Sequence, residues 1–173
     1  PAGINVKNVI SSEYGERKHS VTGNLHKYHA GIDFRLPLNT PLYAPNNGTI
    51  IRSIQANGKF GKVVIIGHNG NKYLSLFAHL NDIFVPRSKE VKKGDLIGYS
   101  GNTGSSTTGA HLHFEVIDGS EIVTAYGETK TAMKWIGDEA GSKVIGLDPG
   151  VARINPRLAF SHLGLAIASL DLI

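Results

Sequence analysis

Hydrophobic residues along the chain gather in short segments that are separated by glycine-containing turns. The turn signals include Asn47-Gly48, Asn57-Gly58, Asn69-Gly70 and Lys93-Gly94. Between such turns, segments rich in Val, Ile, Leu, Tyr and Phe are typical of β-strands, and they cover residues 49–54, 62–67, 72–78, 95–99 and 111–117. Residues 63–66 and 73–78 flank Asn69-Gly70, which predicts a β-hairpin. The pattern therefore favours an antiparallel β-sheet core.

The last third of the chain has a different pattern. Residues 128–140 place Met133, Trp135 and Ile136 at spacings that fit one face of a helix. Asn155-Pro156 is typical of a helix start, with Asn as the N-cap and Pro at the first helical position, so a short helix is expected over about 156–162. No linker separates a second domain. We therefore expect residues 1–173 to form a single, mainly β domain with one or two short helices in the C-terminal third.

The composition restricts which kinds of active site and partner the chain can have more than it restricts the fold. The chain of 173 residues has a formal net charge of +4 and no cysteine. The missing cysteine excludes disulfides, a thiol nucleophile and cysteine-ligated zinc. The basic charge suits an anionic partner, but no aromatic stacking pattern supports nucleic-acid binding. No apolar stretch is long enough for a membrane span. The chain begins at Pro1 without a signal peptide, which suggests a processed form or an excised domain.

Two of the eight histidines, His111 and His113, lie two residues apart in a predicted strand. Side chains at this spacing point to the same face, so both imidazoles can reach one site while Leu112 and Phe114 face the core. Such a pair suits one metal ion, or one ligand beside one acid or base. Two exposed histidines on a polar sheet face would give the same pattern.

A second cluster contains His29 and Asp33, with Gly31 between them to permit a close backbone approach. If the segment is extended, both side chains lie on one side. Asp33 alone fits a turn or cap equally well. A catalytic zinc needs three protein ligands and one open position, which two histidines and one aspartate supply. His79 stands at the end of a predicted strand and joins such a site only if the fold brings it there.

The remaining histidines, His19, His26, His68 and His162, have no comparable partners and are interpreted as surface residues or as residues behind the site. Glu115 receives no role from this pattern.

An ordered series of short motifs resembles the lysostaphin-like, or LytM-type, zinc endopeptidase family. The series comprises Ser12-x-Tyr-Gly-x-Arg17, His29-x-Gly-Ile-Asp33, Thr40-Pro41, Ala44-Pro45, Phe77-Ala-His79-Leu80, Val91-x-Lys-Gly94, Ser100-Gly-Asn-Thr-Gly104, His111-Leu-His-Phe-Glu-Val116 and Asn155-Pro156. The resemblance implies one Zn2+ per chain held by His29, Asp33 and His113, with His79 and His111 as catalytic residues. It also implies an antiparallel β-sheet domain with a substrate groove over the sheet.

Three features depart from the family pattern. The loop over residues 103–110 is one residue longer than usual, Ala110 replaces a common proline, and residues 118–154 form a long excursion before Asn155-Pro156. We expect a core over about 11–160 and a tail over 161–173. The excursion is expected to wall one side of the groove, although Trp135 fits a helix packed on the sheet better than a substrate contact.

By resemblance, the chain is expected to be a bacteriolytic metalloendopeptidase that hydrolyses peptide crosslinks or stem peptides of bacterial peptidoglycan. A metal-activated water would attack directly, and the strand position beside His113 favours His111 over His79 as general base. The alternative is an inactive cell-wall-binding or regulatory module of the same fold. Peptidoglycan peptides and anionic wall polymers are the expected partners of a monomer or of a domain within a larger protein. The expected location is extracytoplasmic (secreted, periplasmic or wall-associated), or in a phage lysin (endolysin) or virion.

Overall fold

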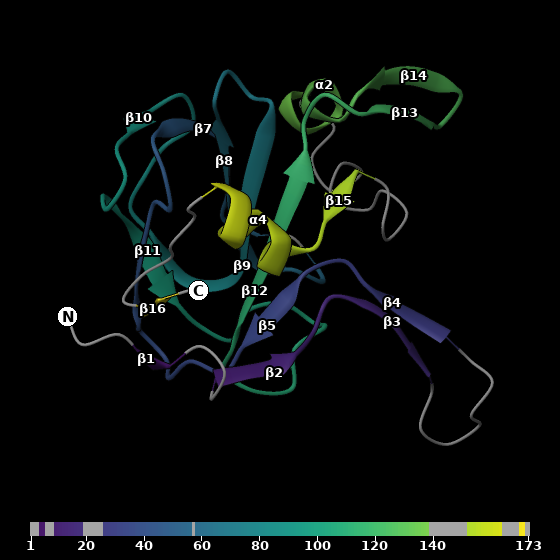
Figure 1. Ribbon diagram of the computed structural model, residues 1–173. Helices are drawn as coiled ribbons and strands as arrows, with labels where there is room; N and C mark the ends of the chain where they lie inside the picture. Colours follow the sequence, from purple (N-terminus) through teal and green to yellow (C-terminus); the bar gives the residue numbers. More distant parts are fainter. Residues whose placement is uncertain are drawn as a thin grey trace.

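The computed structural model describes residues 4–5, 9–18, 26–56, 58–138, 152–163 and 170–171. Its centre is a ten-stranded sheet (Figure 1) in which seven strands follow the order β10-β7-β8-β9-β12-β5-β2. Strand β11 pairs with β6 and β9, and β15 adds to β12. Every pairing in this sheet is antiparallel, which confirms the mainly antiparallel fold.

The strands of the large sheet are β2 (Ile10–Ser12), β5 (Ile32–Phe34), β6 (Pro41–Tyr43), β7 (Gly48–Ile54), β8 (Lys62–His68), β9 (Tyr73–Ile83), β10 (Glu90–Val91), β11 (Leu96–Ser100), β12 (Leu112–Asp118) and β15 (Arg153–Ile154). Smaller pairs are β1 (Ile4–Asn5) with β16 (Leu170–Asp171), β3 (Gly15–Lys18) with β4 (His26–His29), and β13 (Ile122–Ala125) with β14 (Glu128–Thr131). Within the described residues the helices are α2 (Ala132–Gly137) and α4 (Pro156–Leu163).

The predicted hairpin around Asn69-Gly70 is confirmed as β8 and β9. Both turn residues have positive φ, 49° for Asn69 and 65° for Gly70, as a tight hairpin turn requires. The other three predicted strands correspond to β7, β11 and β12 within one residue at each end, whereas β9 extends to Ile83, five residues beyond its predicted end.

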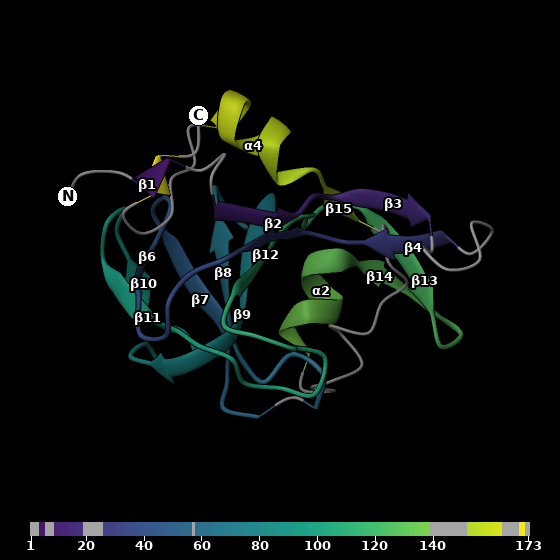
Figure 2. The same cartoon turned by 90° about the horizontal axis from the view of Figure 1, so that it is seen from below.

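The two faces of the sheet are distinguished by the alternation along β12. Leu112, Phe114 and Val116 join the core cluster that also contains Ala159 of α4, whereas Ile117 joins the cluster that contains Trp135 of α2. The two helices accordingly lie on opposite sides of the sheet (Figure 2). His113 and Ile117 are four residues apart in β12, so their side chains lie on the same face of the sheet. His113 therefore lies on the face that α2 covers.

The helix expected over 128–140 is wrong in its first part. Residues 128–131 form β14 instead, because Tyr126 and Gly127 both have positive φ and close a hairpin with β13. Helix α2 begins after Thr131, whose side chain accepts a hydrogen bond from the amide of Lys134. Residues 139–140 lie outside the described part of the chain. Trp135 is buried and donates from Nε1 to the carbonyl of Val123, so its predicted packing role is confirmed.

Helix α4 confirms the Asn155-Pro156 start. The Asn155 side chain accepts from the amide of Arg157, which satisfies one of the unpaired donors of the first turn. The helix continues to Leu163, and β16 pairs in parallel with β1, so the expected tail contains regular structure. Among the described residues, no helix has the length and apolar character that crossing a membrane requires.

Candidate metal centre and active site

Three neighbouring strands bring His29, Asp33 and His113 together. In the β12–β5 pairing, His113 lies directly opposite Asp33, and β4 ends at His29 just before β5 begins. The turn between them passes so close to β12 that a Cβ on Gly31 would stand 2.2 Å from the carbonyl oxygen of Phe114. Only glycine fits this approach, which explains its place between the two polar residues.

The donor atoms of these three side chains converge on one point. Asp33 Oδ1 lies 3.2 Å from His29 Nε2 and 2.8 Å from His113 Nδ1, and the two histidine nitrogens are 3.3 Å apart. Together the three ligand atoms lie within 4.8 Å of one another. Two imidazole nitrogens and one carboxylate oxygen are a donor set that zinc accepts, and three ligands leave one position for substrate or water. The residues therefore fit a catalytic zinc.

His29 is oriented by its own backbone surroundings. Its Nδ1 lies 2.8 Å from the carbonyl oxygen of Glu13 and 3.3 Å from the hydroxyl of Ser12. The carbonyl can only accept, so Nδ1 carries the hydrogen and Nε2 presents its lone pair to Asp33 and His113. This is the tautomer that metal binding through Nε2 requires.

His113 is oriented from behind by a buried ion pair. Its Nε2 lies 3.0 Å from Glu115 Oε2, and Glu115 Oε1 accepts from Arg153 Nε at 2.7 Å. Glu115 is only 1% exposed, and its pairing with Arg153 offsets the cost of burying the carboxylate. With the Nε2 hydrogen donated to Glu115, Nδ1 faces the cluster as a ligand atom.

The protonation of these groups follows from their contacts. Burial alone would raise the pKa of Asp33, but the imidazoles of His113 and His29 beside the carboxylate hold it well below its usual value. Burial would likewise lower the pKa of His113, but hydrogen bonds to Asp33 and Glu115 raise it to about 9. In the metal-free protein His113 therefore carries a proton that a metal ion must displace from Nδ1.

His79 lies inside the long strand β9 rather than at its end. Its φ of 63° is unusual for a non-glycine residue, and such backbone strain tends to occur at functional sites. The ring is 3% exposed and donates from Nδ1 to the carbonyl of Thr103 at 2.7 Å. Burial lowers the pKa of His79 to about 4, so the ring is neutral at neutral pH and its Nε2 is an acceptor.

His111 lies just before β12 and faces the same space. Its ring centroid is 4.6 Å from that of His79, and its Nε2 is 3.9 Å from Asp33 Oδ1. The carbonyl of Gly109 accepts from His111 Nδ1 at 2.8 Å, so the Nε2 lone pair points toward the metal cluster. Two imidazoles with free Nε2 atoms thus stand beside the three candidate ligands.

A cavity of about 300 Å3 opens next to this cluster. It includes Asp33 and His111 and is lined in full by Ser11, Ser12, Asp33, Arg35, Ser106, Thr108, Gly109, Ala110 and His111.

The structure brings all five predicted site residues together, while their roles as ligands and catalysts remain predictions.

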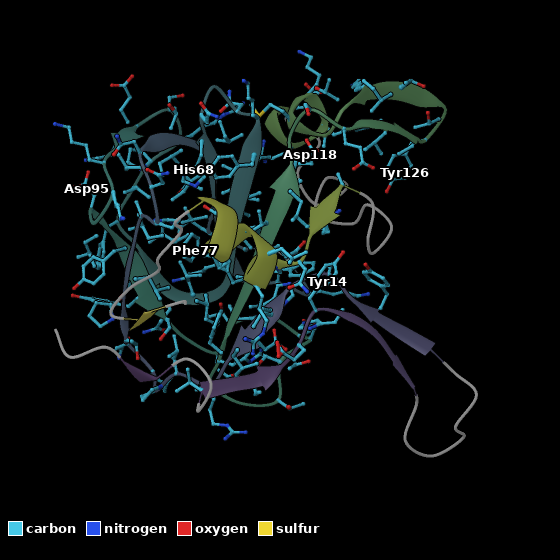
Figure 3. The ribbon with its side chains drawn as sticks, in the orientation of Figure 1. Tyr14, His68, Phe77, Asp95, Asp118 and Tyr126 are labelled. Carbon is cyan, nitrogen blue, oxygen red and sulfur yellow. The ribbon has the colours of Figure 1, made fainter. Side chains whose placement is uncertain are left out.

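His68 lies at the far end of β8 (Figure 3) and is fully buried between Asn47 and Ser75. The sequence interpretation of His68 as a surface residue is therefore wrong. Glu115 was missed, although the two-residue period that paired His111 with His113 extends to it. His19 lies outside the described residues, and the side chains of His26 and His162 do too.

Arg153 had no sequence signal at all. It is placed by β15, where it lies opposite Ile117 and its carbonyl accepts from the hydroxyl of Tyr14 (Figure 3). This strand follows the long excursion. The return of the chain to the sheet therefore places Arg153 against Glu115, which in turn contacts the candidate ligand His113.

The Glu115–Arg153 pair gives a prediction that separates support of the metal site from support of the fold. Arg153→Met should lower the free energy of unfolding by about 3–5 kcal/mol, because a buried carboxylate loses its partner. Zinc affinity should be retained. The double variant with Glu115→Gln should regain stability but bind zinc about 10–100-fold more weakly, because the charge behind His113 is gone.

Denaturation of the zinc-free proteins and competition with a chelator measure the two quantities. Zinc affinity that simply follows stability across the variants would show that Glu115 supports only the fold.

Comparison with known proteins gives the family. Residues 27–125 match the model of peptidase family M23. The peptidoglycan DD-endopeptidase ShyA of Vibrio cholerae is 39% identical over 109 residues, covering 62% of this chain and 24% of the relative. The DD-carboxypeptidase/endopeptidase Mpg of Neisseria meningitidis is 39% identical over 116 residues, covering 65% and 25%. The chain thus spans about a quarter of the length of these curated relatives.

Two solved structures share the fold. A zinc-containing peptidase from Vibrio cholerae is 38% identical with a TM-score of 0.56, covering 62% of this chain and 32% of the other. The catalytic domain of the antimicrobial peptidase lysostaphin from Staphylococcus simulans is 25% identical with a TM-score of 0.57, covering 77% and 96%. The family match spans more than half of the residues and includes all five site residues, and on this evidence the chain belongs to peptidase family M23.

Proposed function

We propose that this chain is a zinc-dependent endopeptidase that hydrolyses peptide bonds in bacterial peptidoglycan. The observation that carries the proposal is the convergence of His29, Asp33 and His113 beside two histidines whose Nε2 atoms are free to accept a proton. Homologues named as peptidoglycan DD-endopeptidases and metalloproteases support the reaction class.

His29, Asp33 and His113 would hold the ion, which supplies a Lewis acid that polarises the scissile carbonyl and lowers the pKa of an attacking water. We assign the first proton transfer to His111, whose Nε2 lies 3.9 Å from the candidate ligand atom of Asp33. His79 donates its Nδ1 hydrogen to Thr103, so it can donate to the developing oxyanion only after its Nε2 has taken up a proton. Phe60, whose ring centroid is 5.8 Å from that of His113, helps to keep water out.

An inactive wall-binding module of the same fold is the rival function. Retention of all five site residues favours the enzyme, because a module without activity has no need for a zinc donor set next to two oriented histidines. We further propose that residues 1–173 act as one domain, outside the cytoplasm where peptidoglycan is found, and that anionic wall polymers contribute to binding through the net charge of +4.

The excursion contributes a platform on the same sheet face as the site. Helix α2 packs there over Ile117, which lies four residues along β12 from His113, and Asp118 marks the end of the strand beside it (Figure 3). Tyr126 at the tip of the β13–β14 hairpin is 62% exposed. We propose that this platform flanks the substrate and helps to select the peptide.

Digestion of purified peptidoglycans of several crosslink types, with mass spectrometry of the products, tests the function. We expect new free amines and carboxyls at one defined peptide bond, and none with the His113→Ala protein. Release of glycan fragments only, or of no product from any peptidoglycan, would contradict the proposal.

A further inference from the structure

The cavity beside the metal cluster contains a charge that the proposed chemistry does not use. Asp33 and Arg35 are the acidic and the basic side chain among its lining residues. Asp33 is engaged by His29 and His113, as described above. Arg35 lies two residues further along the chain and is exposed. A cation in the cavity wall next to the reacting atoms calls for an anionic part of the substrate.

The backbone holds Arg35 on the side of the metal cluster. Phe34 is fully buried in the core on the other face of the sheet, so its neighbours Asp33 and Arg35 both project to the face of the site. The amide of Arg35 donates to the carbonyl of Val9 at 2.6 Å, which extends the pairing of β5 with β2. Two residues of extended chain place Arg35 roughly 7 Å from Asp33 along the backbone.

The guanidinium of Arg35 differs from those of the other arginines whose side chains the structure describes. Among arginines with described side chains, four bind a carbonyl or carboxylate elsewhere in the described chain: Arg52, Arg87, Arg153 and Arg157. Arg35 has no such partner within the described residues, although it lines the cavity. Its planar fork of donors is therefore available to a ligand.

We propose that this cavity binds the free carboxylate of the substrate residue that follows the scissile bond, through Arg35. The proposal rests on the proposed function, because it places the scissile bond at the metal cluster. A carboxylate matches a guanidinium with two parallel hydrogen bonds, and the adjacent serine and threonine hydroxyls can complete its shell.

This chemistry names the substrate class. A free carboxylate follows the scissile bond in two kinds of peptide. In the first, the enzyme removes the C-terminal residue, which carries the terminal carboxylate. In the second, the crosslink is made to an amine on a carbon atom that also carries a carboxylate. Inside a glycine bridge, the next group is another peptide bond, which is neutral. Arg35 therefore favours D,D-peptides with this carboxylate over glycine bridges.

Two peptides that end in D-Ala-D-Ala, one with a free carboxylate and one with a carboxamide, test the assignment. The zinc-loaded protein should hydrolyse the carboxylate form with a kcat/KM about 10–100-fold higher, since hydrogen bonds to charged groups are the stronger ones. Arg35→Gln should reduce this preference to near one, chiefly by lowering kcat/KM for the carboxylate form. Lys89→Gln, which removes an exposed charge next to β10 at the opposite edge of the sheet, should keep the preference.

NMR titration of the zinc-free protein with the same two peptides measures binding and is independent of hydrolysis. The carboxylate peptide should bind more tightly to the parent protein, and the two peptides should bind equally to Arg35→Gln. If the parent cleaves neither these peptides nor any crosslinked peptidoglycan but shows this Arg35-dependent binding, the proposed function fails while the carboxylate site stands. A preference that survives Arg35→Gln in both assays, or no preference in the parent, would overturn the site.

Discussion

Replacing His113 by alanine is expected to release zinc and reduce peptidoglycan hydrolysis to background. His113 contributes the nitrogen closest to Asp33, at 2.8 Å, and its loss leaves two ligands where a catalytic zinc needs three. Elemental analysis after dialysis should find about one zinc per chain in the parent protein. The variant should contain well under one.

His111→Ala is the matched control for this experiment, because it removes the same side chain two residues earlier. It should retain zinc. Full zinc retention in His113→Ala, with a folded protein confirmed by circular dichroism, would remove His113 from the ligand set.

His79→Ala and His111→Ala should each reduce the rate of hydrolysis about 10²–10⁴-fold, the usual contribution of a general acid or base. Both should keep zinc, because neither side chain contributes to the cluster of candidate ligand atoms. The two losses should be far from additive in the double variant if the histidines act on the same proton.

The pH dependence of the rate adds a second readout. The pKa of His79 is lowered to about 4 by burial, so above that pH its Nε2 is unprotonated and able to take up a proton during the reaction, and below it Nε2 is already protonated. By the same shift, neutral His79 stabilises the fold above the unfolded-state pKa of about 6.5, and this contribution is lost as the pH falls toward 4. Hydrolysis at the parent rate by both single variants would show the mechanism to be wrong.

Most of the sheet was predictable because strands and hairpin turns have recognisable local sequence patterns. Turn residues such as Asn69-Gly70 specify the hairpin geometry, and the alternation of Leu112, His113 and Phe114 separates a core face from a site face. The segment 128–131 failed because its residues fit a helix face as well as a strand. The choice was made by the Tyr126-Gly127 turn and the pairing with β13, which no helical period reveals.

The residues of the site could be predicted, but the contacts that hold them in position could not. The family resemblance placed His29, Asp33 and His113 as ligands, and the β12–β5 register brings them together. The Glu115–Arg153 pair and the burial of His79 depend on contacts between distant segments. Arg153 is 38 residues from Glu115 along the chain, and Thr103 is 24 residues from His79. Tertiary contacts of this kind leave no local pattern in the sequence.

If His29, Asp33 and His113 form a catalytic zinc site, hydrolysis must depend on one bound zinc. Stepwise addition of zinc to the metal-stripped protein, with hydrolysis of purified peptidoglycan measured at each step, tests this dependence. We expect no hydrolysis without metal and a rate that rises to a plateau near one zinc per chain. Hydrolysis by the stripped protein at the full rate, or none at any zinc level, would contradict it.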